Sequence, residues 1–205
     1  MYLRPVFTET DPERIDALIR AHSFGLLVTH GGTGSEATHL PFVLSRDGGE
    51  LLLEAHLAAA NPQCAALAGG AALAVFSGPH AYISPRWYEA QPSVPTWDYV
   101  AVHVHGVLQP VTEPGEMRAM LDRLAEADPV GYTTADQSDS YIAGMLRGIR
   151  AFRLRTTQVQ AQWKMSQNRS AEDRIRVAAA LRGQGEETVA DLIAATLPQA
   201  EGWPQ

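Results

Sequence analysis

The sequence contains a single cysteine, a single lysine and no long apolar run. Because Cys64 stands alone, an internal disulfide and a cysteine-built metal site are both excluded. No stretch approaches the roughly 18–20 apolar residues that cross a bilayer, and the N-terminus lacks the apolar segment of a secretory signal. We therefore expect a soluble, cytoplasmic protein that has no membrane as a partner.

Positive charge is also scarce, since 16 Lys and Arg face 23 Asp and Glu for a formal net charge of −7. Proteins that bind nucleic acids usually neutralise phosphates with a basic surface. The arginines within 147–155 alternate partly with apolar residues, which is typical of a solvated strand face. The composition therefore argues against DNA as a partner, but it does not exclude DNA binding. Lys164 is singled out because arginine supplies every other basic side chain.

What the sequence does contain is a series of short β patterns separated by glycine-rich turns. The segment Tyr99–Val111 alternates in period two, with Val100 and Val102 on one side and His103 and His105 on the other. The expected strands cover 24–29, 37–44, 51–57, 72–76, 81–84, 99–111 and 152–165. A Gly-Pro pair between the fourth and fifth of these strands predicts a turn there.

Helix starts are signalled by residues that cap helices or suit their first turn. Pro12 follows an N-cap aspartate, Asn61 is followed by a proline and predicts a short helix through Leu67, and Ser170 begins a capping-box pattern. Further helices are expected at 114–127, 141–149 and 186–197.

The order of these elements predicts the fold class. A doubly wound fold is excluded because strands do not alternate regularly with crossover helices. Six or seven strands with peripheral helices indicate a mainly β (α+β) protein built on a small antiparallel barrel. We expect a single domain over 1–205, with the barrel and its helices in 1–165 and a C-terminal helical extension in 166–205.

Few residues carry chemistry that can be recognised directly. His103 and His105 share a strand face and could pair as metal ligands, but no third ligand stands at a diagnostic spacing, so no metal is expected. The sequence has no G-x-S-x-G nucleophile motif, no P-loop and no G-x-G-x-x-G. Catalytic residues are therefore not identified, and whether the protein is an enzyme stays open.

Five unusual strings mix aromatic residues with small polar groups at strand ends, where ligand sites at the rim of a barrel are built. They are Thr38–Phe42, His56–Pro62, Gly78–Pro85, Val94–Tyr99 and Trp163–Arg169.

In their order and spacing these strings resemble the PaiB-like FMN-binding negative transcriptional regulators of the flavin split-barrel superfamily. The resemblance runs from about residue 1 to about residue 182 and rests on H-L-P-F, G-P-H-A-Y-I-S-P-x-W-Y, V-P-T-W-x-Y-V-A-V-H and W-K-x-S-Q-N-R. Two features depart from the family pattern: Asp98 stands where the family has Asn, and the loop 89–93 is shorter.

The resemblance implies a six-stranded antiparallel split barrel that binds FMN at the interface of a homodimer. The cofactor-binding residues it suggests are Thr38, His39, Leu40, Pro41, His56, Ala58, Asn61, Trp97, Tyr99, Lys164, Ser166 and Gln167. The extended run 38–41 would offer backbone groups to the polar edge of the flavin. Trp97 and Tyr99 would come from the partner chain and cover the flavin ring.

The FMN phosphate is expected near His56, Ala58 and Asn61, because the free amides of a helix N-terminus stabilise a phosphate. Lys164 and Ser166 would assist, the lysine as a point charge.

Three functions remain open at this stage. The protein could be a flavin-binding transcriptional regulator, or an FMN-dependent oxidoreductase of a small molecule in which the flavin itself carries the redox chemistry. It could also bind heme or another flat ligand, with His39, His56, His103 or His105 as axial donors.

No helix-turn-helix is identified, because the helix and turn at 171–185 are flanked by acidic residues that would approach DNA poorly. The strands Tyr99–Val111 and Phe152–Met165 carry apolar residues on both faces, which favours a homodimer.

Overall fold

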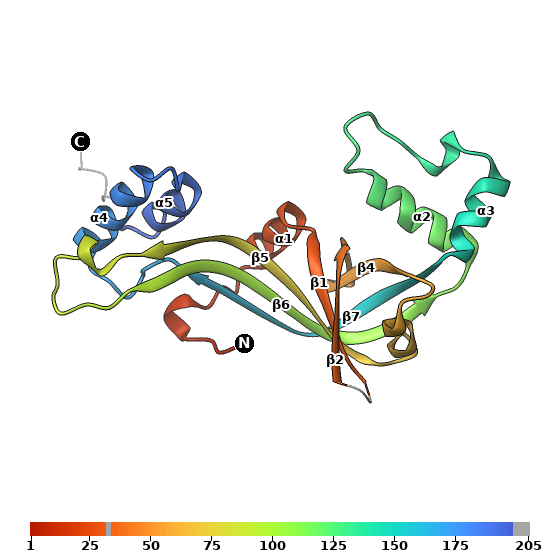
Figure 1. Ribbon diagram of the computed structural model, residues 1–205, viewed down its shortest axis with the longest axis horizontal. Helices are drawn as coiled ribbons and strands as arrows, with labels where there is room; N and C mark the ends of the chain where they lie inside the picture. The colour runs from red at the N-terminus through yellow and green to blue at the C-terminus, as the bar shows by residue number, and fades with distance from the viewer. Residues whose placement is uncertain (32–33, 199–205) are drawn as a thin grey trace. The chain divides into compact units, whose positions relative to one another are not determined.

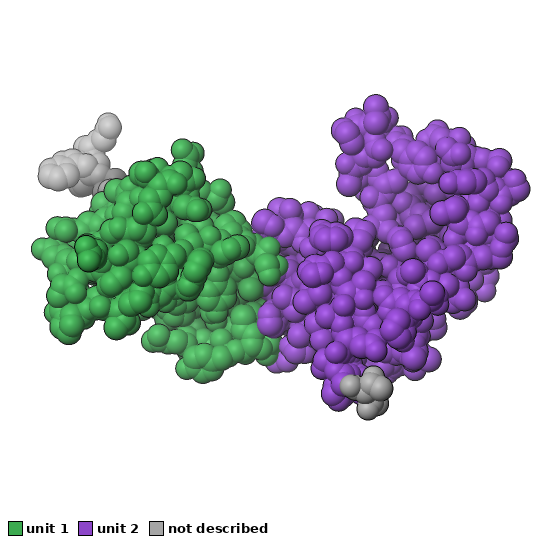
Figure 2. Space-filling view, in the orientation of Figure 1, with its two compact units in different colours: residues 1–11, 77–101, 160–205 green, residues 12–76, 102–159 purple. Residues whose placement is uncertain are grey.

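The computed structural model describes residues 1–31 and 34–198, and these fall into two compact units (Figure 2). Unit 1 comprises 1–11, 77–101 and 160–205, and unit 2 comprises 12–76 and 102–159. Residues 199–205 of the expected C-terminal extension lie outside the described residues. Three long strands, β5 (Ala71–Ile83), β6 (Thr96–Val111) and β7 (Ile149–Lys164), contribute residues to both units.

The described residues form one seven-stranded sheet in the order β2-β1-β5-β6-β7-β4-β3. The remaining strands are β1 (Phe24–Gly31), β2 (Gly34–Pro41), β3 (Val43–Asp47) and β4 (Glu50–Ala58). The pairs β1–β2, β1–β5, β3–β4 and β4–β7 are all antiparallel. A mainly β protein with peripheral helices is therefore confirmed.

The expectation of a six-stranded split barrel is wrong, since the sheet of the described residues has seven strands and is not closed. The run 37–44, expected as one strand, is divided at Phe42 into β2 and β3. The first of these pairs with β1 and the second with β4, so the run belongs to two ladders at opposite ends of the strand order.

The expected turn at Gly78-Pro79 is also wrong, because β5 continues through it as one strand. Pairing between β5 and β1 covers only Ala72–Val75. Beyond Val75 no N–H is required for this ladder, so a proline, which has none, is tolerated within the strand.

Unit 2 contains α1 (Pro12–Ala21), α2 (Pro114–Ala125) and α3 (Asp139–Arg147) (Figure 1). The period-two alternation expected for β6 is confirmed here, since Val102 and Val104 are fully buried and His103 and His105 are half-buried.

A buried charge joins three elements of unit 2. Glu54 of β4 is 3% exposed and accepts hydrogen bonds from Arg123 of α2 at 2.5 Å and from Arg153 of β7 at 2.9 Å. Arg153 also forms an ion pair with Glu116 of α2 at 3.1 Å. These contacts anchor α2 to the sheet.

Unit 1 is built on the strand ends of β5, β6 and β7. Its N-terminal segment lies along β7, through a bridge between Thr8 and Gln162 and a 3.0 Å hydrogen bond from the Glu9 N–H to the Ala161 carbonyl. A short 3-10 helix, η1 (Pro5–Phe7), buries Phe7.

The helices α4 (Ala171–Arg182) and α5 (Glu187–Ala194) pack against each other in unit 1 (Figure 1). The predicted start of α4 is confirmed, since the Ser170 hydroxyl accepts the Asp173 N–H at 3.1 Å. The Asp173 carboxylate accepts the Glu89 N–H at 2.7 Å and so ties α4 to the segment between β5 and β6. Across the described part of the chain, none of the helices has the length and apolar character needed to span a bilayer.

Candidate functional site

The predicted site residues are divided between the two units. Unit 2 holds Thr38, His39, Leu40, Pro41, His56, Ala58 and Asn61, and unit 1 holds Trp97, Tyr99, Lys164, Ser166 and Gln167. Each group contains residues that the fold brings into direct contact.

In unit 2, Thr38 of β2 and Asn61 are joined by a hydrogen bond from the Asn61 amide to the Thr38 hydroxyl at 3.1 Å. The Thr38 hydroxyl in turn donates to the side chain of Gln63. Gln63 is buried and its amide donates to the Thr29 hydroxyl at 3.0 Å and to the Glu36 carbonyl at 3.1 Å. This side chain, which the sequence motifs did not single out, fixes two of the predicted segments to each other.

The strand β2 that carries residues 38–41 lies at one end of the strand order and is paired only with β1 among the described strands. Leu40 is buried, whereas His39 is exposed and stacks on Phe24 with ring centroids 5.9 Å apart. The backbone groups on the second edge of β2 have no strand partner in the described residues, so they can bind a ligand.

The expected helix after Asn61 is a 3-10 helix of five residues, η2 (Pro62–Ala66). The Asn61 side chain itself accepts the Gln63 N–H at 2.9 Å, so one of the free amides at this end is already satisfied. Such a short helix does not supply the aligned peptide dipoles that stabilise a phosphate. The helix N-terminus therefore adds little to the phosphate site expected at His56, Ala58 and Asn61, which stays a prediction.

His56 of β4 has a polar atom that the protein leaves unsatisfied. Its Nδ1 is buried and has no hydrogen-bond partner in the described residues. Burial lowers the pKa of His56, so the imidazole is neutral at pH 7. A neutral imidazole nitrogen in this position can accept or donate a hydrogen bond to a bound ligand.

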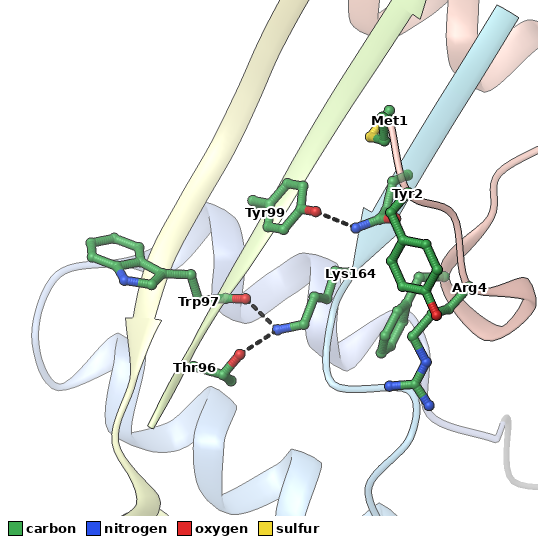
Figure 3. Close-up of a pocket in the computed structure, with 9 residues that line it drawn as sticks. Met1, Tyr2, Arg4, Thr96, Trp97, Tyr99 and Lys164 are labelled. Atoms are coloured by element: carbon green, nitrogen blue, oxygen red, sulfur yellow. Dashed lines mark hydrogen bonds between the residues drawn. The ribbon is translucent and has the colours of Figure 1, made fainter. Parts of the chain in front are cut away.

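In unit 1, Lys164 at the end of β7 contacts the start of β6 (Figure 3). Its ammonium donates to the Thr96 hydroxyl at 2.7 Å and to the Trp97 carbonyl, and it lies 3.3 Å from the carboxylate of Asp98. The Ser166 hydroxyl donates to the other carboxylate oxygen of Asp98 at 2.6 Å.

Asp98 is completely buried, and this burial raises its pKa. The hydrogen bond from Ser166 and the charge of Lys164 act in the opposite direction and do not fully compensate. Asp98 therefore balances much of the lysine charge that was expected to serve a phosphate.

The residues after Lys164 form a tight turn. Ser166 has a φ of +57°, a left-handed conformation that is uncommon for a residue other than glycine. The Gln167 side chain accepts the Met165 N–H at 2.7 Å and donates to the Trp163 carbonyl at 2.6 Å. Gln167 thus closes the turn that positions Lys164 and Ser166.

A cavity of about 400 Å³ lies beside Lys164 in unit 1 (Figure 3). Its lining residues are Met1, Tyr2, Arg4, Phe7, Thr96, Trp97, Tyr99, Gln162 and Lys164. The indole of Trp97 points away from Lys164 (Figure 3). Its ring centroid lies 5.9 Å from that of Tyr82. It is 54% exposed, so it is available to a further molecule.

Comparison with known proteins identifies the family. The model of the family described as "Putative FMN-binding domain" matches residues 1–158. The protease synthase and sporulation protein PAI 2 of Bacillus subtilis is 32% identical over 188 residues, which cover 90% of each chain. The chain belongs to the PaiB-like FMN-binding domain family. This confirms the family and the cofactor, FMN, that the sequence motifs predicted.

Solved structures similar to this PaiB-like chain share its fold at low sequence identity. The FAD and heme binding protein of Mycobacterium smegmatis has a TM-score of 0.57 at 17% identity, over 77% of this chain and 73% of that one. The flavocytochrome Anf3 of Azotobacter vinelandii has a TM-score of 0.57 at 12% identity, over 79% of this chain and 72% of that one.

The residues of unit 2 fit an FMN molecule on chemical grounds. The isoalloxazine ring needs hydrogen bonds to its polar edge, and the open edge of β2 at 38–41 has backbone groups to provide them. The unsatisfied Nδ1 of His56 offers one more polar contact to a hydroxyl or a phosphate oxygen.

Proposed function

We propose that the protein is an FMN-binding regulator of the PaiB type, and that its two units are parts of one flavin-binding domain. The three strands β5, β6 and β7 run through both units, which supports a single domain. In this proposal the backbone of Thr38–Pro41 binds the polar edge of the flavin. His56, Ala58 and Asn61 lie towards the ribityl phosphate.

The observation that carries the cofactor site is the buried Nδ1 of His56, which has no partner within the described residues. An unpaired buried polar atom costs about 1–3 kcal/mol, so its persistence favours a ligand that satisfies it. When bound, FMN supplies redox chemistry. The protein binds and orients it through the rigid contact between Thr38, Asn61 and Gln63.

We further propose a homodimer in which the partner chain supplies aromatic cover to the flavin. The exposed ring of Trp97 supports this role, whereas the half-buried Tyr99 lines the cavity beside Lys164 in its own chain. Lys164 and Ser166 act indirectly, because they are engaged with Asp98, and Gln167 positions their turn. A monomeric mass in solution at micromolar concentration would contradict the dimer and the partner role of Trp97.

The cofactor test is a fluorescence titration of FMN with the full chain, in which binding quenches the flavin. His56→Gln should weaken the affinity about tenfold, the loss expected for one buried hydrogen bond of roughly 1.4 kcal/mol. His30→Gln is the matched control, because His30 is exposed and lies outside the predicted site. An unchanged affinity in His56→Gln would remove His56 from the site.

The regulatory role is tested by DNA binding at moderate salt. A site-specific complex with the upstream region of its own gene is expected, in a form that depends on FMN or its redox state. The absence of any specific complex would contradict regulation through DNA. NAD(P)H-driven reduction of the bound flavin would instead support an FMN-dependent oxidoreductase, which the small-molecule cavity of unit 1 favours as the second candidate.

A further inference from the structure

The cavity of unit 1 has a lining that is aromatic and cationic. Tyr2, Phe7 and Tyr99 contribute rings, and the charged side chains in its lining are those of Arg4 and Lys164, with no carboxylate among the lining residues (Figure 3). In a chain of net charge −7 a pocket of this composition attracts anions locally. Its volume of about 400 Å³ lies in the range of small-molecule sites.

Arg4 is the cation in this cavity that is free to bind an anion. Its guanidinium lies 5.3 Å from the centre of the Phe7 ring and forms no ion pair in the described part of the chain. Lys164, by contrast, directs its hydrogen bonds to Thr96 and Trp97 and has Asp98 beside it. A bound anion is therefore held chiefly by Arg4.

Two neutral polar groups of the cavity have unused hydrogen-bonding capacity. The Tyr99 hydroxyl accepts a hydrogen bond from the Gln162 amide, and the hydroxyl proton has no acceptor among the described residues. The side-chain oxygen of Gln162 is buried and has no partner there. The Tyr99 hydroxyl is thus a free donor next to the cations of the cavity. The Gln162 oxygen is a buried acceptor that a ligand with a polar hydrogen would satisfy.

We propose that this cavity binds a small aromatic anion that also carries a hydroxyl or N–H group. The anionic group is held by Arg4 and the Tyr99 hydroxyl, and the ring lies between the side chains of Tyr2, Phe7 and Tyr99. The hydroxyl or N–H of the ligand donates to the Gln162 oxygen and satisfies it. Gln162 is the residue that distinguishes a hydroxylated ligand from its plain analogue.

The inference rests on the proposed function in one respect, because a ligand here would be the small molecule to which a flavin-binding dimer responds. Binding itself requires only unit 1. The two proposals therefore fail separately: FMN binding without binding of the probe overturns this inference, whereas binding of the probe without FMN overturns the cofactor proposal alone.

The experiment is a calorimetric titration of the full chain with 4-hydroxybenzoate, with and without FMN. Benzoate lacks the hydroxyl, 4-hydroxybenzyl alcohol lacks the charge, and cyclohexanecarboxylate lacks the aromatic ring. Saturable one-site binding of 4-hydroxybenzoate is expected, with each of the other three compounds at least about fivefold weaker, which corresponds to roughly 1 kcal/mol per lost contact. Equal affinity for benzoate would overturn the role of Gln162.

Variants locate the site. Arg4→Ala and Tyr99→Phe should each weaken 4-hydroxybenzoate binding about fivefold, and Arg4→Lys should recover part of the loss. Arg86→Ala is the matched control, because it removes one exposed positive charge from the same unit outside the cavity. An equal loss of affinity in Arg86→Ala would show that the effect of Arg4→Ala comes from the change in net charge, and it would overturn the role of Arg4. Competition between FMN and the probe would place the flavin in this cavity and overturn the proposal.

Discussion

The carboxylate of Asp98 and the ammonium of Lys164 lie 3.3 Å apart, between the start of β6 and the end of β7. The Asp98 side chain is almost completely buried, whereas 19% of the Lys164 side chain is exposed. Removal from water therefore costs the charge of Asp98 more free energy than the charge of Lys164. For Asp98, the free-energy cost of burying the charge exceeds the gain from its partners, since its pKa is raised.

This asymmetry predicts unequal effects of removing either charge. Lys164→Met leaves a buried carboxylate without its cation and should lower the free energy of unfolding by about 3 kcal/mol. Asp98→Asn keeps the shape and can still accept a hydrogen bond from Ser166, so it should lower that free energy by less than about 1 kcal/mol or raise it. Urea denaturation at pH 7 measures both, and equal losses would contradict the prediction.

Stability should also depend on pH through Asp98. Its raised pKa means that the folded state binds the proton more tightly than the unfolded state. The free energy of unfolding therefore falls as the pH rises from the ordinary aspartate value through the folded pKa. Asp98→Asn should remove this fall, which denaturation curves at a series of pH values between 4 and 8 would detect.

Because of His56, the free energy of unfolding should also fall as the pH is lowered, which is opposite to the effect of Asp98. Burial lowers its folded pKa, so the unfolded state binds the proton first as the pH falls below about 6.5. Stability is then lost as the pH falls from 7 towards the folded pKa, and His56→Gln should reduce that loss.

The reduction should be partial, because burial also lowers the pKa of His103. His30→Gln serves as the matched control, because it removes an exposed imidazole in place of a buried one. An acid-induced loss that is the same in His56→Gln and the wild type would contradict the prediction.

The buried carboxylate of Glu54, which joins α2 to the sheet, should contribute strongly to the free energy of unfolding. Glu54→Gln weakens the hydrogen bonds from Arg123 and Arg153 and should lower the free energy of unfolding by about 3 kcal/mol. Glu50→Gln is the matched control, since Glu50 is 70% exposed, and its 3.4 Å ion pair with Arg155 should contribute less than about 0.5 kcal/mol. Similar losses in the two variants would contradict the prediction, because the buried Glu54 would then contribute no more to stability than the exposed Glu50.

Gly106 should tolerate no side chain. A Cβ atom at this position of β6 would collide with the backbone carbonyl of Arg155 on β7, so Gly106→Ala should cost about 2–3 kcal/mol of unfolding free energy. Gly115→Ala is the control, because nothing lies within 4 Å of its added Cβ. Thermal unfolding compares the two, and an unchanged midpoint in Gly106→Ala would contradict the close approach of the strands.

Local patterns in the sequence predicted most of the elements. The N-cap at Ser170 and the alternation in β6 are properties of neighbouring residues, so they can be identified without a structure. The division of 37–44 and the continuity of β5 through Gly78-Pro79 depend on which strand lies alongside. That information is not contained in a local pattern.

The candidate site was predicted in part for the same reason. The family motifs singled out Lys164 and the two aromatic residues near it, but the bond from Lys164 to Thr96 and its approach to Asp98 join segments far apart in the chain. Gln63 and Arg4 were missed because neither stands in a recognised motif, although Gln63 follows directly after Asn61 and Pro62. The position of Gln63, a polar residue just after a helix N-cap, was the one signal in the sequence that could have identified it.

The chain crosses between the units four times, after residues 11, 76, 101 and 159, and this sets an order in which it can fold during synthesis. Every segment of unit 2 has been translated once residue 159 is made, whereas unit 1 still lacks 160 onwards, including the end of β7 and both of its α-helices. Until residues 160–164 are made, the segment 1–11 and the start of β6 lack the end of β7 that lies beside them in the folded chain. Until then, apolar side chains that the folded unit 1 buries, such as Ile83 and Val100, are exposed to other nascent chains, so a chaperone has most to protect in this interval.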